Sequence, residues 1–236
     1  MTLPASFYRV AALASALSAL ATGLLIFLPD LFVEGSDLAT RMGRVREPAY
    51  QLRAWVYFFH PILVFTAALA VALRLRARPA WALPGLIGFA LWAATELAQQ
   101  CLTLFVFDPW RRAWLAGDAA VRATIETRIL LYDALWDAAY YLLLTGFFIG
   151  CLCYAILLLR RDRLSRVVGA LYVAAAALTL SFFVAGLGGP SLPPSLDRWL
   201  YPALQPLARL LIAWWLWRHA DERVPLDRAE PARASA

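Results

Sequence analysis

The sequence contains no lysine, since all 22 basic residues of the 236-residue chain are arginine. A retinal-binding photoreceptor is excluded, because its Schiff base needs a lysine amine. Charged residues make up only 16% of the chain, against about 25% in soluble domains. Hydrophobic residues make up 62%, where a soluble domain has about 45–50%. A chain of this composition must bury its excess apolar surface in lipid.

Cysteine is also scarce, and three residues are too few for a disulfide framework. Cys101, Cys151 and Cys153 all lie in apolar runs, so we interpret them as small packing residues. The sequence shows no Ser/His/Asp arrangement, no glycine loop that would cradle a phosphate and no aspartate-rich diphosphate motif. It therefore identifies no cofactor.

Six apolar segments predict an all-α, polytopic transmembrane helix bundle over residues 1–220. These segments are residues 7–28, 54–73, 81–107, 129–159, 164–186 and 196–217. Gly146 and Gly150 form a small-x-x-x-small pair that we expect to pack inside the bundle rather than at a dimer seam. The polar segment 221–236 is expected to be a disordered cytoplasmic tail.

The arginines predict that both termini are cytoplasmic. In that orientation the inner segments hold 12 arginines, several of them clustered in the short links 74–78 and 160–166. The outer segments hold nine, and their long loops 31–52 and 108–128 dilute them with Asp and Glu. Each long loop has room for a short interfacial helix. The net charge of +6 is thus a topology signal and not a nucleic-acid signal, and we predict a multi-pass protein of the bacterial cytoplasmic membrane.

Ionisable residues inside the predicted spans are the strongest functional signal, since each costs about 2.5–3.5 kcal/mol on insertion scales. They are His60, Glu96, Asp133, Asp137 and Arg209. At a rise of 1.5 Å per residue, all but the shallower Asp133 lie roughly 10–18 Å below the outer ends of their spans. A similar depth on four helices predicts one shared polar cavity in the outer half of the bilayer.

Helical spacing places further polar residues on the same faces. The four resulting stripes are Arg53, Tyr57 and His60; Glu96, Gln99, Gln100 and Thr103; Asp133, Asp137, Tyr140 and Tyr141; and Tyr201, Gln205 and Arg209. From them we predict catalytic carboxyls at Glu96 and Asp137. We predict ligand-binding roles for His60, Gln99, Gln100, Asp133, Tyr140, Tyr141, Gln205 and Arg209. No tight metal-ligand motif is present, so no metal is assigned.

The charges on these stripes do not balance, because three carboxylates face one arginine and one histidine. One interpretation is a purely structural ion-pair network, in which Arg209 neutralises Glu96 or Asp137. The other is a functional, acidic cavity. In that case protons, a metal or a cationic ligand make up the difference, or one carboxyl stays protonated because burial penalises its charged form.

The second half of the chain carries a pattern of motifs over residues 85–218. The pattern consists of Trp136-Asp137 in an apolar helix, a Gly/Ala-rich run to Leu159, Arg160-Arg161, the segment Leu164-Ser165-Arg166-Val167-Val168-Gly169, and a final Trp215-Leu216-Trp217-Arg218. It resembles the uncharacterised six-helix bacterial membrane family catalogued as domain of unknown function four-three-eight-six. Ser165 stands where such proteins often carry a proline. The resemblance implies an architecture and no activity.

Three functions fit these observations. The cavity binds a small lipophilic or cationic ligand or handles protons. Alternatively, Glu96 or Asp137 acts as a general acid in an intramembrane cyclase or isomerase for an isoprenoid or sterol-like lipid, with Trp136, Tyr140 and Tyr141 facing a developing carbocation. In the third hypothesis the protein is an accessory subunit of a membrane complex and has another membrane protein as its partner. The polar cluster is then purely structural.

Overall fold

The computed structural model describes residues 3–32 and 37–222, without the side chains of 195–198, and this part of the chain is all-helical. Five helical segments in it are long and apolar enough to cross a membrane. They are Ala5–Leu31, Pro48–Leu75, Pro79–Ala116, Ala119–Leu158 and Arg163–Gly186. The chain is therefore an all-α, multi-pass membrane protein. The predicted sixth span falls on helix α8 (Pro194–Arg218), which is not among these five, and its role as a span stays a prediction.

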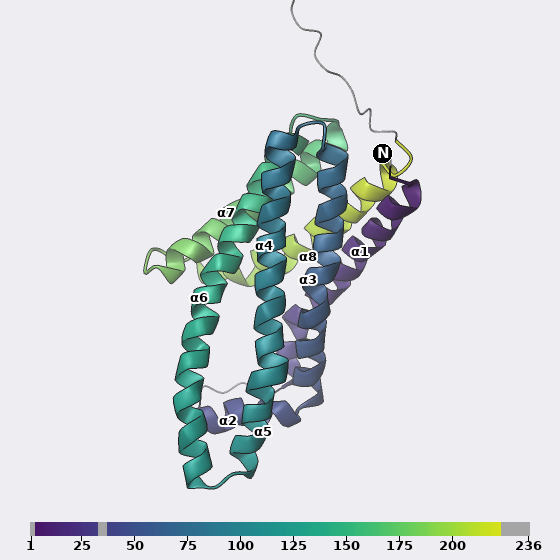
Figure 1. The fold of residues 1–236 in the computed structure, drawn as a ribbon. Coiled ribbons are helices and arrows are strands. Elements are labelled where there is room, and N and C mark those ends of the chain that lie inside the picture. The colour runs from purple at the N-terminus through teal and green to yellow at the C-terminus, as the bar shows by residue number, and fades with distance from the viewer. Residues whose placement is uncertain (1–2, 33–36, 223–236) are drawn as a thin grey trace, which may run out of the picture.

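The described chain consists of long helices and short connecting ones (Figure 1). The order is α1 (Ala5–Phe27), η1 (Leu28–Leu31), α2 (Leu38–Gly43), η2 (Arg44–Arg46), α3 (Pro48–Leu75), α4 (Pro79–Leu102), the π-helical turn η3 (Thr103–Phe107), α5 (Asp108–Ala116), α6 (Ala119–Leu158), α7 (Arg163–Gly186) and α8. Short helices connect α1 to α3 and α4 to α6, and the other long helices follow one another directly. The short helices α2 and α5 lie in the loops where interfacial helices were expected. Helix α6 begins ten residues before the predicted span.

The side chains of α1 show why this bundle belongs in lipid. Its inner face carries small residues such as Ala11, Ser15 and Ser18, each fully buried against neighbouring helices. Its outer face carries Leu13 and Leu20, more than half exposed. A soluble helix has the opposite distribution, with its large apolar residues in the core.

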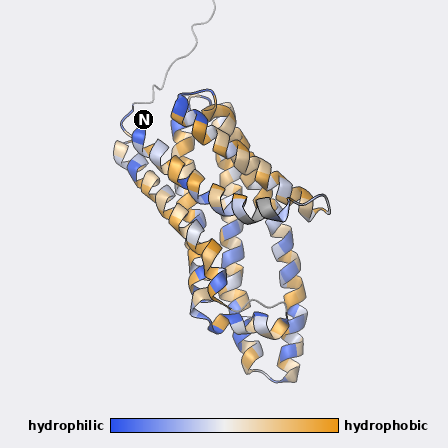
Figure 2. Ribbon diagram, turned by 180° about the vertical axis from the view of Figure 1, so that it is seen from behind, coloured by the Kyte–Doolittle hydropathy of each residue, from blue (hydrophilic) through white to orange (hydrophobic). Residues whose placement is uncertain are grey.

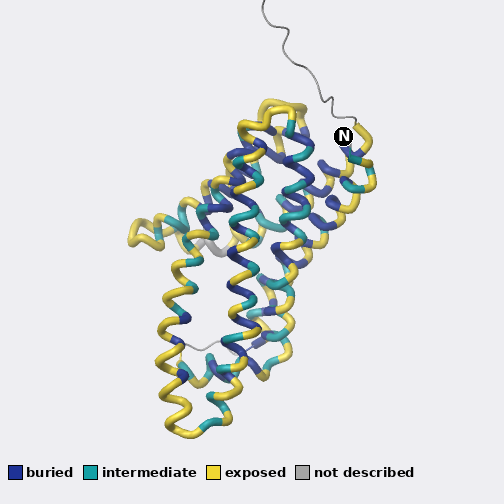
Figure 3. Tube along the Cα trace, in the orientation of Figure 1, coloured by how far each residue is buried: buried dark blue, intermediate teal, exposed yellow. Residues whose placement is uncertain are grey.

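The other long helices also expose large hydrophobic residues, such as Ile62 on α3, Ile87 on α4 and Leu130 on α6. Hydrophobic residues run along all the long helices in Figure 2, and buried and exposed residues alternate along them in Figure 3.

Helices α4 and α6 approach each other backbone to backbone at three glycines. A Cβ added to Gly88 would lie 2.6 Å from the Gly150 nitrogen and 2.7 Å from the Gly146 oxygen. The expectation that Gly146 and Gly150 pack inside the bundle is thereby confirmed. Their partner on α4, Gly88, was not predicted.

Arginines join the helix ends at one end of the bundle. There Arg74 donates to the carbonyls of Ala220 and Glu222 and lies 3.8 Å above the Tyr8 ring. Arg9 pairs with Asp221 at 3.0 Å at the same end. This end gathers the segments that were predicted to be cytoplasmic, although the orientation in the membrane and the count of six spans stay predictions. Residues 223–236 of the predicted tail lie outside the described residues.

The glycine crossing generates a direct test. We expect Gly88→Ala to destabilise the protein by roughly 1–3 kcal/mol, because the new methyl group meets backbone atoms that cannot rotate away. The measurement is thermal unfolding in detergent. The matched control is Gly23→Ala on α1, where an added Cβ meets nothing within 4 Å. Equal stability of the two variants would contradict the close approach of α4 and α6.

Candidate functional site

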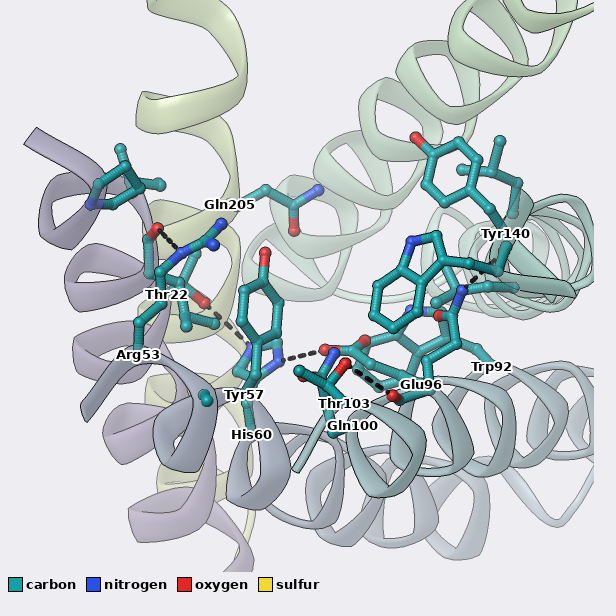
Figure 4. Close-up of a pocket in the computed structure, with 18 of the residues that line it drawn as sticks. Thr22, Arg53, Tyr57, His60, Trp92, Glu96, Gln100, Thr103, Tyr140 and Gln205 are labelled. Carbon is teal, nitrogen blue, oxygen red and sulfur yellow. Dashed lines mark hydrogen bonds and ion pairs between the residues drawn. The ribbon is translucent and has the colours of Figure 1, made fainter. Parts of the chain in front are cut away.

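The polar stripes converge on one cavity of about 880 Å³ inside the bundle. It is lined by residues from all six long helices and extends to α2, η2 and α5 at the end opposite Arg74. Figure 4 shows its polar side chains pointing toward one another. Eight of the ten predicted site residues line it: His60, Glu96, Gln99, Gln100, Asp133, Tyr140, Gln205 and Arg209.

The other two predicted residues, Asp137 and Tyr141, do not line the cavity. Successive residues of an α-helix are turned by about 100° around its axis. Measured from Asp133 on α6, Tyr140 points within roughly 20° of the same direction. Asp137 and Tyr141 point about 40° and about 80° away from Asp133, on the side opposite to Tyr140. Asp137 is exposed, and the Tyr141 hydroxyl donates to the Gly186 carbonyl at 2.6 Å, at the end of α7. The structure therefore does not bring them to Glu96, and a catalytic role for Asp137 stays a prediction.

A buried dyad of His60 and Glu96 lies at the centre of the cavity. His60 Nδ1 is 3.2 Å from Glu96 Oε1, and both side chains are less than a tenth exposed. On its other side, His60 Nε2 lies 3.2 Å from the Thr22 hydroxyl, which donates to the Ser18 carbonyl at 2.8 Å. The Trp92 ring meets the His60 ring edge to face at 5.9 Å. Three helices thus fix the imidazole in one orientation.

The proton arrangement of the dyad depends on the Thr22 hydroxyl, which carries a single proton. Where that proton goes to the Ser18 carbonyl, His60 Nε2 donates to Thr22. The remaining proton is shared between His60 Nδ1 and Glu96 Oε1. The dyad is then either a neutral imidazole with a carboxylic acid or an imidazolium with a carboxylate. In both forms its net charge is zero.

Two further carboxylates near the cavity are paired with arginines. Arg41 on α2 makes a two-pronged contact with Asp133 on α6, with one N–O distance of 2.8 Å. Arg111 lies 2.9 Å from Asp108 and also contacts the Tyr50 hydroxyl. Neither arginine entered the sequence-based charge balance, because both lie outside the predicted hydrocarbon spans.

Arg209 is different, because no carboxylate or other acceptor among the described residues contacts its guanidinium. Its side chain is buried, with 7% of the residue exposed, and it lies 5.9 Å and 6.0 Å from the ring centres of Trp92 and Phe147. The ion pair that the structural interpretation expected, between Arg209 and Glu96 or Asp137, is not formed.

The lining is accordingly more basic than acidic. Five arginines line it, at positions 41, 44, 53, 111 and 209, against the two carboxylates of Glu96 and Asp133. The expectation of an acidic cavity is therefore wrong. It counted only charges inside the spans and missed the arginines that reach in from the helix ends and the short helices.

Two glutamines in the cavity serve different purposes. Gln99 donates to the Trp136 carbonyl at 3.1 Å and so ties α4 to α6. Gln100, 5% exposed, keeps its amide toward the cavity. Directly after them the chain forms the π-helical turn η3, where Thr103 contacts the Tyr132 hydroxyl at 3.0 Å. Single π-helical turns inside helices are frequent at functional sites.

Sequence reasoning missed several lining residues. Arg53, Tyr57, Thr103 and Tyr201 were on the predicted stripes but were not selected as site residues. Thr22 gave no clear signal, because a threonine on an Ala/Ser-rich helix face is typical of helix packing. Within the described part of the chain, no three His, Cys, Asp or Glu side chains are grouped to hold a metal ion.

Comparison with protein-family models, with curated proteins and with solved structures found no match to this chain. The resemblance to the six-helix family of unknown function therefore stays a prediction.

The Arg41–Asp133 contact can be tested by a double-mutant cycle. We expect a coupling free energy of about 0.5–1 kcal/mol between Arg41→Gln and Asp133→Asn, modest because both side chains are about a third exposed. The measurement is the stability of the wild type, both single variants and the double variant. Strictly additive effects would contradict the pairing of α2 with α6.

Proposed function

We propose that this membrane protein binds a small lipophilic molecule in the cavity and that the His60–Glu96 dyad is its proton-carrying polar anchor. The supporting observation is a cavity that combines large aromatic walls with a buried pair of titratable groups. At about 880 Å³ its volume is at the upper end of the roughly 300–1,000 Å³ typical of small-molecule sites. A structural ion-pair network needs no such space, because its charged groups would contact one another directly.

The walls suit a ligand that arrives from the membrane. Phe147 and Leu144 on α6, Leu178 and Phe182 on α7, and Trp92 on α4 supply apolar lining at the depth of the spans. Polar groups occupy only part of the lining. A few placed polar groups in an apolar pocket are typical of sites that fix the orientation of a ligand.

The dyad also favours a second candidate, an intramembrane enzyme that uses acid–base chemistry. A proton held between an imidazole and a carboxyl group can be given to a bound substrate and taken back. While the substrate holds the proton, its positive charge faces the negative charge left on the dyad. Tyr140 and Trp136, which also line the cavity, would face such a substrate. The predicted second acid, Asp137, lies outside the lining, so this candidate depends on Glu96 alone.

The test is mass spectrometry of molecules that co-purify with the wild type and with Glu96→Gln. We expect a specific lipophilic molecule in the wild type and at least a tenfold loss in the variant, because a charge-assisted hydrogen bond is worth about 1.5–3 kcal/mol. The comparison variant is Asp137→Asn, which neutralises a carboxyl group outside the lining and should retain the molecule. A single unchanged molecule in the wild type would favour binding, whereas a mixture of substrate and product would favour catalysis.

A second variant covers the case in which Glu96→Gln fails to fold. Leu143→Trp adds volume to a lining position without changing any charge, and it should exclude the molecule from a folded protein. Folding is checked by gel filtration and thermal unfolding. If the wild type carries no specific molecule, or if a folded Leu143→Trp variant carries it undiminished, the proposed function is contradicted.

A further inference from the structure

The guanidinium of Arg209 is a buried positive charge with no negative partner in the described structure. An arginine stays protonated in proteins, so it cannot escape burial by losing its proton. An uncompensated charge in the interior of a membrane bundle costs several kcal/mol. The two aromatic rings near Arg209 supply a weak attraction to the cation but no hydrogen-bond acceptor in its plane. A compensating anion is the missing element.

The neighbouring groups do not provide that anion. Glu96 contacts His60 and not Arg209, and the dyad has no net charge where His60 Nε2 donates to Thr22. Asp133 is held by Arg41, and Asp108 by Arg111, at the end of the cavity near α2 and α5. None of these carboxylates therefore makes a direct ion pair with Arg209.

A second guanidinium in the same cavity also lacks a carboxylate. Arg53 donates through Nε to the Leu25 carbonyl at 3.5 Å and lies 5.0 Å from the Tyr57 ring centre (Figure 4). The amides of Gln100 and Gln205 face the same space. Gln205 lies four residues before Arg209 and thus on the same face of α8. Amide N–H groups beside a guanidinium are the donors that carboxylates and phosphates accept from.

We propose that the ligand is an anionic amphiphile, a carboxylate or a phosphate monoester on a lipophilic tail, and that Arg209 binds its anionic group. The inference rests on the proposed function, since it names the chemical class of the molecule in that cavity. Gln205 and Gln100 line the space around the anionic group. The tail lies along Phe147, Leu178 and Phe182. A small inorganic anion would fill only a fraction of the cavity and would leave these apolar walls without contacts.

The test compares four probes that share one tail and differ in the head group. They are oleate, oleyl phosphate, oleyl alcohol and oleylamine, each titrated by native mass spectrometry against the folded, delipidated protein. We expect oleate or oleyl phosphate to bind the wild type at least tenfold more tightly than oleyl alcohol, and oleylamine to bind more weakly than the alcohol. Whichever anion binds more tightly identifies the carboxylate or the phosphate as the head group.

Variants assign the preference to its residue. Arg209→Met should bring the affinity of both anions to that of the alcohol and leave the alcohol unchanged, whereas Arg209→Lys should retain part of the preference. Arg112→Met removes an exposed arginine outside the lining and should behave as the wild type. If Arg209→Met does not fold, Arg53→Met replaces it, with a smaller loss of anion preference expected.

The outcomes separate this inference from the proposed function. Equal binding of all four probes, or tighter binding of oleylamine, would overturn the anionic ligand and leave a lipophilic site standing. A folded Arg209→Met variant that keeps the anion preference would also overturn the role of Arg209 and leave a lipophilic site standing. Absence of binding by every probe in the wild type would contradict both proposals.

Discussion

Compensation of buried charge is the constraint on which this structure depends. In water an unpaired arginine or carboxylate is solvated, but inside a lipid-embedded bundle each charge needs a partner with good geometry. The protein meets this need locally: Arg41 pairs with Asp133, Arg111 with Asp108, and His60 with Glu96. The Arg41–Asp133 pair joins α2 to α6. Asp108 and Arg111 both lie in α5, and their contacts with the Tyr50 hydroxyl join α5 to α3. Arg209 and Arg53 are lining residues for which the described residues offer no carboxylate partner, and of the two Arg209 is buried.

Helix packing explains why there is a cavity at all. Helices α4 and α6 touch backbone to backbone at Gly88 and Gly146. Toward η3 the two helices are separated by large side chains, with Phe107 and Tyr132 stacked at a ring-centre distance of 4.3 Å. Small residues at one level and aromatic residues at the other make the two helices diverge along their length. The space between the α4–α6 pair and the helices α1, α3 and α8 is then lined by the polar stripes.

The sequence predicted much of this arrangement for identifiable reasons. Apolar runs of sufficient length gave the long helices, and polar residues at spacings of three and four located the faces of α3, α4 and α8 that meet in the cavity. The same reasoning failed on α6, where Asp133, Asp137 and Tyr141 follow a spacing of four and drift by about 40° at each step. It also omitted Arg41 and Arg111, because their contacts with the cavity arise from the way short helices fold back, which is a tertiary effect. Those arginines make the lining more basic than acidic. The charged residues inside the predicted spans therefore could not predict the sign of the net charge of the lining.

The central claim is that the His60–Glu96 dyad carries no net charge, so that Arg209 is not neutralised from within. The most direct measurement is ¹⁵N NMR of the His60 ring in a His219→Gln variant, because the chain has only two histidines. The account predicts a protonated Nε2 that donates to Thr22, with the second proton shared between Nδ1 and Glu96. An imidazole with an unprotonated Nε2 and a proton only on Nδ1 would leave Glu96 as a carboxylate that compensates Arg209, and it would contradict the account.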